Sequence, residues 1–205
     1  MVTECMLVRH GEIQANVERL WHGTTDSDLT VTGAQQVKHL GLHFSDINVT
    51  ISKIYSSPLM RTVKTAQAIG QHQNLEVIPI AGLIEFGVGE WEGLSYETIA
   101  SEHRFFDLIA EDQNFQPVGG ESVNQVADRI TKAFFSLVEQ HRGERIVMVG
   151  HGAAFAILMA GLLEGSPFPF FHHHMSNTGV SVLEVAEDNS VQRRSFDATE
   201  HLQPN

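Results

Sequence analysis

Four side chains that can bind or transfer a phosphoryl group follow strand-like apolar runs in this sequence. Two are cations and two are imidazoles: Arg9, His10, Arg61 and His151. The planar guanidinium of arginine bonds phosphate oxygens in pairs, and a neutral imidazole has a nitrogen that can attack phosphorus. Residues of these types in these places indicate phosphoryl chemistry, provided that the fold brings them together.

The elements that would position these side chains alternate along the chain. Apolar and β-branched runs predict strands over 5–8, 51–57, 76–80, 145–149, 180–185 and 191–196. Helical patterns predict helices over 34–44, 58–72, 104–110, 123–138 and 153–163. The helix start signals are two capping boxes, a serine before a proline, and one further serine: Thr32 with Gln35, Ser122 with Gln125, Ser57 with Pro58, and Ser95.

This alternation predicts an α/β fold, a three-layer sandwich whose mostly parallel central sheet is covered by helices on both faces. The length suits a single domain over residues 1–205. Ligands of such sheets bind outside the carboxyl ends of the strands. We therefore expect Arg9, His10, Arg61 and His151 to meet at one edge of the sheet.

His10 is the side chain that we expect to react. Neighbouring cations disfavour the imidazolium form, which leaves a nitrogen free to attack phosphorus and form a phosphohistidine. The leaving alkoxide then needs a proton from a carboxylic acid at the mouth of the pocket. Glu85 is the favoured candidate, while Glu90 and Glu92 lie nearby and either take this role or sit in solvent.

An ordered series of motifs resembles the histidine phosphatase superfamily, also called phosphoglycerate mutase-like. The series covers the chain from about residue 5 to about residue 185, in family order: Val8-Arg9-His10-Gly11-Glu12, Asn16, Gly23, Leu29-Thr30, Ser56-Ser57-Pro58-Leu59-Met60-Arg61, Thr65-Ala66, Leu83-Ile84-Glu85, Gly89-Glu90-Trp91-Glu92-Gly93, Gly119-Gly120-Glu121-Ser122 and Gly150-His151-Gly152. An isolated Arg-His-Gly is a weak signal, whereas the ordered series is specific.

The resemblance implies a phosphoglycerate mutase-like fold and roles for the matching residues. The implied catalytic set comprises the phosphorylated nucleophile, the proton donor and a phosphate clamp: His10, Glu85, and Arg9 with Arg61 and His151. The implied substrate-binding set comprises a phosphate contact, an entrance loop and a helix N-terminus: Asn16, His22 with Gly23, and Gly152. No cofactor and no metal ion is expected.

The segment 94–118 bears on the choice between hydrolysis and mutase-type transfer. A mutase must hold a bisphosphorylated acid, which calls for extra cations, but this segment contains one cation, Arg104, and five acidic residues. We therefore predict metal-independent hydrolysis of a small phosphomonoester, with 94–118 as an apolar lid that contains three phenylalanines. The alternatives are mutase-type transfer, a protein phosphohistidine or phosphoserine phosphatase, and a noncatalytic phospho-ligand binding module.

The composition argues against other classes of protein. Acidic residues outnumber basic ones by 25 to 13, and this charge balance disfavours a nucleic-acid binder. No run approaches the roughly 18–20 apolar residues of a membrane span, and no signal segment begins the sequence, so we expect a cytoplasmic protein without a membrane partner. A monomer or homodimer is expected, with the single cysteine, Cys5, as a buried core thiol.

The run His172-His173-His174 raises the question of a metal site. Three consecutive side chains cannot all face one ion in a regular element, and no further ligand stands at a regular spacing around them. We expect these histidines to lie on the surface or to contact a partner. The preceding Pro- and Phe-rich stretch, 167–171, is expected to pack into the core.

Overall fold

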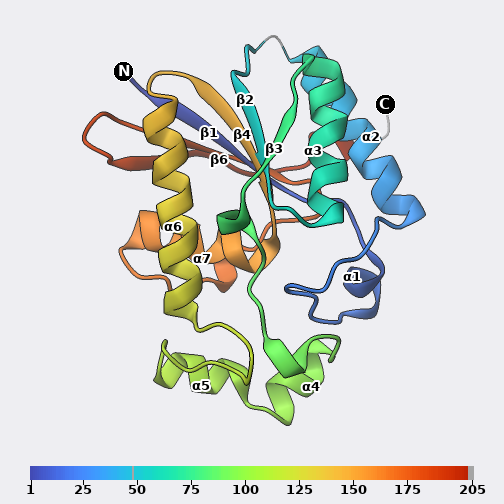
Figure 1. Ribbon diagram of the computed structural model, residues 1–205, viewed down its shortest axis with the longest axis vertical. Coiled ribbons are helices and arrows are strands. Elements are labelled where there is room, and N and C mark those ends of the chain that lie inside the picture. Colours follow the sequence, from blue (N-terminus) through green and yellow to red (C-terminus); the bar gives the residue numbers. More distant parts are fainter. Residues whose placement is uncertain (48, 203–205) are drawn as a thin grey trace.

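A computed structural model describes residues 1–47 and 49–202 of the chain. It contains a six-stranded sheet in the order β3-β2-β4-β1-β5-β6, and Figure 1 labels five of these strands. The strands have these bounds: β1 Thr3–Arg9, β2 Lys53–Ser56, β3 Val77–Pro79, β4 Arg145–Gly150, β5 Val180–Val185 and β6 Val191–Ala198. All six strands that the sequence predicts are present, with ends shifted by up to two residues.

The sheet is mostly parallel, as predicted. β1 pairs with β4, and β2 pairs with β3 and β4, all in parallel. β5 pairs antiparallel with both β1 and β6. The carboxyl ends of β1, β2 and β4 therefore lie at the same edge of the sheet, the edge on which the predicted site depends.

Helices cover both faces of this sheet (Figure 1). Their bounds are α1 Gln14–Glu18, α2 Val31–Asp46, α3 Met60–Gln73, α4 Tyr96–Ser101, α5 Phe105–Glu111, α6 Val123–Gln140 and α7 Gly152–Glu164. Short 3-10 turns are η1 Ala81–Leu83, η2 Gly89–Trp91, η3 Phe171–His173 and η4 Glu200–Leu202. The predicted α/β sandwich is thereby confirmed.

The side-chain alternation of β1 divides the apolar core into two layers. Cys5 and Leu7 belong to the layer that contains residues of α6 and α7, whereas Met6 and Val8 belong to the layer that contains residues of α2 and α3. Successive residues of a strand point to opposite faces, so one apolar strand serves both layers. Burial raises the pKa of the Cys5 thiol to about 12, as expected for a core thiol.

Two of the predicted helix starts are wrong. Thr30, not Thr32, caps α2, because the Thr30 Oγ1 accepts from the Gly33 backbone N–H at 2.9 Å. α3 begins at Met60, with Leu59 rather than Ser57 in the cap position.

The other two predicted caps are confirmed. Ser95 caps α4, and Ser122 with Gln125 forms the capping box of α6. Across the described residues, no helix has both the length and the apolar character that a bilayer crossing requires.

Candidate active site

Neighbouring parallel strands bring His10 and His151 together. β1 ends at Arg9 and β4 at Gly150, and these two residues are register partners. The next residue of each strand is a histidine, and the His10 backbone N–H donates to the Gly150 carbonyl at 3.0 Å. The two imidazole centroids lie 5.3 Å apart, and both rings are buried. Two residues separated by 141 positions thus become neighbours through strand register.

Arg61 is fully buried beneath the same edge. Its Nε donates to Nδ1 of His151 at 3.3 Å. Its Nη1 donates to the Thr25 carbonyl at 2.8 Å, and its Nη2 to the carbonyls of Gly23 at 2.9 Å and His22 at 3.2 Å. The guanidinium is thus held by a backbone loop on one side and orients His151 on the other.

These contacts give the two imidazoles complementary tautomers. The Nδ1 of His10 lies 2.7 Å from the Gly11 carbonyl, which can only accept, so Nδ1 carries the hydrogen and Nε2 keeps a free lone pair. His151 accepts at Nδ1 from Arg61, so its Nε2 carries a hydrogen. This His151 Nε2 is buried and has no hydrogen-bond partner among the described residues. The site therefore offers a nucleophilic nitrogen beside a free donor.

Both imidazoles are held neutral. Burial, followed by the charges of Arg9 and Arg61, lowers the pKa of His10 well below its ordinary 6.5. Burial, followed by Arg61, His10 and Arg9, does the same to the pKa of His151. The sequence predicts the effect of the cations, but desolvation is the larger cause. Neutral imidazole is the form that can attack phosphorus.

Arg9 reaches the site from the end of β1. Its Nη1 donates to the Met175 carbonyl at 2.5 Å, and its Nε is buried without a hydrogen-bond partner among the residues that the structure describes. A Cβ at Gly152 would lie 3.4 Å from both Nε and Cζ of Arg9. The bare glycine backbone therefore leaves space beside the guanidinium.

Glu85 faces the N-terminus of α7. Its Oε1 accepts from the backbone N–H groups of Phe86 at 2.7 Å and Ala154 at 2.8 Å, and its Oε2 accepts from Ala153 at 3.0 Å. The sequence predicts that helix N-terminal amides bind the phosphoryl group. In the structure these two amides of α7 bind the carboxylate of Glu85, because its segment crosses the helix end.

Sequence reasoning missed the roles of two residues near Glu85: Arg129, which bonds the Glu85 backbone, and Glu121, which bonds Arg129. Arg129 of α6 donates from Nη2 to the Glu85 carbonyl at 2.8 Å and from Nη1 to the Ile84 carbonyl at 2.8 Å. Glu121 accepts from Arg129 Nε at 2.6 Å and from the Gly87 backbone N–H at 3.1 Å. The signal in the sequence that could have pointed to this pair is the Gly-Gly-Glu-Ser motif, in which the acidic side chain of Glu121 had no assigned role.

Asn16 and Asn177 form a further polar pair at the site. The Asn16 Oδ1 accepts from the Ile13 backbone N–H and from the Asn177 side-chain amide, both at 3.1 Å. The Asn177 amide also donates to the His10 carbonyl at 3.0 Å. With its oxygen engaged, Asn16 has its NH2 group available for an anion. Asn177 was missed because nothing in its local sequence distinguishes it from an ordinary loop asparagine.

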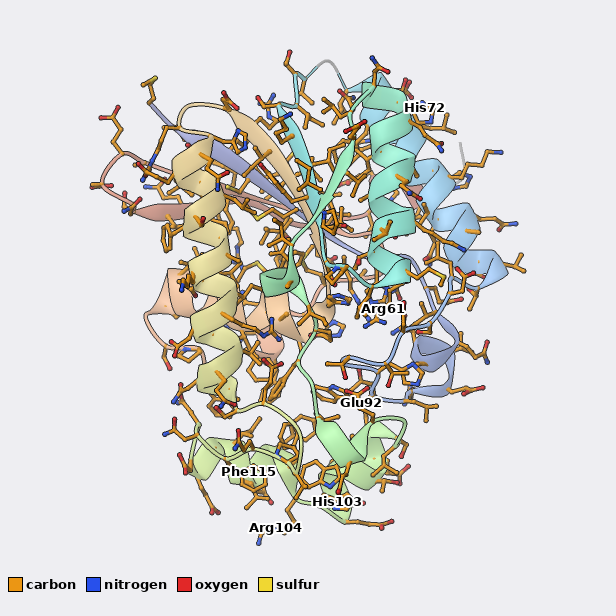
Figure 2. All side chains as sticks on the ribbon, in the orientation of Figure 1. Arg61, His72, Glu92, His103, Arg104 and Phe115 are labelled. Carbon is orange, nitrogen blue, oxygen red and sulfur yellow. The ribbon has the colours of Figure 1, made fainter. Side chains whose placement is uncertain are left out.

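Glu92 organises the loop that holds Arg61. Its carboxylate accepts from the backbone N–H groups of Gly23 at 2.9 Å and Thr24 at 3.0 Å, and from the Thr25 hydroxyl at 2.8 Å. Figure 2 shows Glu92 between Arg61 and the 94–118 segment. Of the two expectations for Glu92, a free position in solvent does not hold, because its carboxylate is bonded to this loop. Gly23 serves the site through its backbone, which bonds Glu92 and Arg61. A side chain does not fit at this position, because a Cβ would collide with the Phe86 carbonyl.

A cavity of about 440 Å³ borders this site. Five predicted site residues line it: Arg9, Asn16, His22, Glu85 and Gly152. The other lining residues are Trp21, Tyr96, Phe106, Ala153, Ala156, Phe170, Phe171, His174 and Asn177. His10, Arg61 and His151 are buried and do not line the cavity themselves, but two of them bond to residues that do: the His10 carbonyl accepts from Asn177, and Arg61 donates to the His22 carbonyl. The name phosphate floor is used below for Arg9, His10, Arg61 and His151.

The histidine run has a partner that the spacing did not indicate. Glu164, the last residue of α7, lies 2.7 Å from His172 Nε2 and 2.8 Å from His173 Nε2 through the same oxygen. Arg193 lies 3.1 Å from the other nitrogen of His173, and its N–H can only donate, so the hydrogen of His173 faces Glu164. His173 is also buried rather than on the surface, while His174 lines the cavity. The cluster ties η3 to the end of α7 by hydrogen bonds.

Comparisons with known proteins place the chain in a family. The model of the histidine phosphatase superfamily (branch 1) matches residues 5–198. A curated relative, the probable phosphoglycerate mutase GpmB of Salmonella paratyphi A, is 34% identical over 183 residues, which are 88% of this chain and 84% of that protein.

Two solved phosphatases are similar over nearly the whole chain. The phosphoserine phosphatase of Entamoeba histolytica, in a complex with phosphoserine, has 30% identity and a TM-score of 0.88, covering 98% of this chain and 100% of its own. The mycobacterial glucosyl-3-phosphoglycerate phosphatase has 25% identity and a TM-score of 0.83, covering 97% and 100%.

Proposed function

Because the chain belongs to the histidine phosphatase superfamily (branch 1), we propose that it is a phosphomonoester hydrolase that acts on a small phosphorylated metabolite. One observation carries the proposal. His10 holds a neutral imidazole with a free Nε2 beside two buried donors that have no partner among the described residues, Arg9 Nε and His151 Nε2. A tetrahedral oxyanion would satisfy both donors and place its phosphorus next to the nucleophile.

In the first step, the His10 Nε2 attacks phosphorus and the bond from phosphorus to the ester oxygen breaks. Arg9 and His151 donate to the equatorial oxygens, on which negative charge is spread in the transition state. Glu85 gives its proton to the leaving oxygen. Its Oε2 accepts a single backbone hydrogen bond, so this oxygen has a lone pair available to carry that proton.

In the second step, the Glu85 carboxylate takes a proton from water, and the resulting hydroxide attacks the phosphorus of the phosphohistidine. The bond between His10 and phosphorus breaks, and inorganic phosphate leaves. Each group returns to its starting protonation state, and no metal ion enters either step. Two easier displacements thereby replace one difficult hydrolysis.

Mutase-type transfer is the second candidate, because a probable phosphoglycerate mutase is 34% identical to this chain. A mutase must retain a doubly charged intermediate while it reorients. The single cation of 94–118, Arg104, instead pairs with acidic neighbours, at 3.3 Å from Asp107 and 3.9 Å from Glu111. This pairing supports hydrolysis over transfer. A phosphoprotein phosphatase and a noncatalytic binding module are further alternatives.

The proposal is tested with phosphate release from a panel of phosphomonoesters, each assayed with and without a chelator. We expect activity that survives the chelator and falls on the order of 10⁴-fold or more in His10→Ala, since removal of a nucleophile has effects of this size. His72→Ala, at an exposed histidine of α3, is the matched control. Rapid quenching with ³²P-labelled ester should leave label on the wild-type chain and none on His10→Ala.

Three results would overturn the proposal. One is activity that requires an added divalent cation. Another is an unlabelled wild-type chain during rapid turnover. The third is interconversion of 2- and 3-phosphoglycerate that outruns phosphate release, which would establish the mutase alternative.

A further inference from the structure

Five aromatic side chains line the cavity that borders the phosphate floor. The name aromatic mouth is used below for Trp21, Tyr96, Phe106, Phe170 and Phe171. Phe106 from α5 and Phe171 from η3 meet edge to face with ring centroids 5.5 Å apart, so two segments distant in sequence form one apolar wall. Trp21 and Tyr96 continue this wall at a centroid separation of 5.3 Å.

Part of this apolar surface is exposed. Phe171 is 47% and Tyr96 39% accessible, whereas the adjacent Phe170 and Trp21 are buried. An exposed aromatic edge beside a cavity gains from covering by an apolar group. The leaving group of a phosphoester held on the floor would extend into this space. The partly exposed rings are therefore placed to contact the organic part of the substrate.

Cationic side chains are scarce in the same cavity. Among the described residues that line it, Arg9 is the sole arginine or lysine, and Arg9 belongs to the phosphate floor. Figure 2 shows Arg104 at the bottom of the molecule in this view, well away from Arg61. Burial lowers the pKa of His174 to about 4, so this lining imidazole is neutral near pH 7. The carboxyl of Glu85 adds an acidic group to the cavity.

We propose that the cavity selects phosphomonoesters of uncharged aromatic or apolar alcohols and discriminates against leaving groups that carry a carboxylate. The inference rests on the proposed function and narrows its substrate class. It separates this chain from similar proteins that hold phosphoserine or 3-phosphoglyceric acid, since both of those ligands carry a carboxylate. A carboxylate inside the aromatic mouth would lose hydration without gaining a cationic partner.

Phenyl phosphate and 4-carboxyphenyl phosphate form a matched pair of substrates for the test. They share the aromatic ring and differ by one carboxylate. We expect kcat/KM to be about 10- to 100-fold higher for phenyl phosphate, the size of effect that an unpaired charge in an apolar site produces. The assays run at pH 8, well above the pKa of about 4 for His174, so that this imidazole of the lining adds no positive charge.

A charge introduced at the mouth should reverse the preference. Phe171→Lys places an ammonium group at the exposed edge of the cavity and should raise the ratio of kcat/KM for 4-carboxyphenyl over phenyl phosphate about tenfold. Leu42→Lys, at a similarly exposed apolar position of α2, is the matched control and should leave this ratio unchanged. Circular dichroism verifies that both variants are folded.

The outcomes separate this inference from the proposed function. Equal or faster turnover of 4-carboxyphenyl phosphate, 3-phosphoglycerate or phosphoserine by the wild-type chain overturns the substrate inference and leaves the hydrolase proposal standing. An unchanged ratio in Phe171→Lys also overturns it. Failure to release phosphate from any ester in a His10-dependent manner overturns the proposed function, and the substrate inference with it.

Discussion

The phosphate floor and the aromatic mouth lie in one site but are held in different ways. On the floor, Arg61 donates to three backbone carbonyls and to His151, and the tautomer of each histidine is set by a hydrogen bond. At the mouth, Phe106 and Phe171 meet through ring contacts that any apolar side chain of similar size could partly replace. Directional bonds fix the geometry of the floor, whereas nondirectional packing shapes the apolar wall.

Substitution of Arg61 should have the largest effect on the phosphate floor. Either Arg61→Lys or Arg61→Ala should lower kcat about 10³-fold or more, because lysine lacks the planar fork that joins the 22–25 loop to His151. Steady-state kinetics measures this loss. Lys64→Ala, at an exposed position on the same helix, should stay within about twofold. Activity close to wild type in Arg61→Lys would show that charge alone suffices at this position.

Glu85 connects the two regions, and its predicted effect depends on the leaving group. Glu85→Gln should reduce kcat about 10²- to 10³-fold for an alkyl phosphate, because an alkoxide needs a proton as it leaves. The loss should be much smaller for 4-nitrophenyl phosphate, whose leaving group departs readily as an anion. Equal losses for the two esters would contradict the role of Glu85 as proton donor.

Glu92 gives a smaller test of how the floor is supported. Glu92→Gln places an amide NH2 group opposite the backbone N–H of either Gly23 or Thr24, which bond different oxygens of the carboxylate, and should loosen the loop that holds Arg61. Kinetics should show a fall in kcat of about tenfold, since small displacements of catalytic groups are costly. Glu90→Gln, an exposed neighbour in the same motif, is the control and should remain near wild type.

The buried histidines of the floor also predict how stability depends on pH. Unfolded His10 takes up a proton near pH 6.5, whereas folded His10 has its pKa held well below that value and stays neutral. Below pH 6.5 the unfolded state therefore binds more protons, and the free energy of unfolding falls as the pH falls, by up to about 1.4 kcal/mol per pH unit for each such histidine.

Urea unfolding between pH 7 and pH 5 measures this slope. His10→Gln removes one titrating group and should make the unfolding free energy less dependent on pH. His72→Gln, at an exposed site, should retain the wild-type slope. Equal slopes in wild type and His10→Gln would mean that His10 does not contribute to acid destabilisation.

The local sequence predicted the sheet and the positions of the chemically active groups well. Apolar runs of strand length locate all six strands, and parallel order places the residues after β1 and β4 at one edge. Arg9, His10 and His151 could therefore be predicted to be neighbours, because a strand end is both a feature of sequence and a position in space. The caps of α4 and α6 were also predictable, because a capping side chain bonds to a backbone N–H only three residues along the chain.

Longer-range hydrogen bonds needed the tertiary structure. Glu92 bonds to a loop 67 to 69 residues earlier, and Asn177 bonds to Asn16 across 161 residues. Glu164 bonds to His172 and His173, which lie 8 and 9 residues later, beyond the end of its helix. Nothing in the neighbouring residues specifies such a partner.

The sequence by itself thus determined which residue types stand at the sheet edge, and it predicted phosphoryl transfer by imidazole as their chemistry. The tertiary structure alone decided which nitrogen of each histidine is free, which amides hold Glu85, and where the apolar mouth lies over the floor. The physical reason is that apolar periodicity acts over a few residues, whereas a hydrogen bond requires two specific atoms to lie about 3 Å apart, and that distance is set by the packing of whole elements.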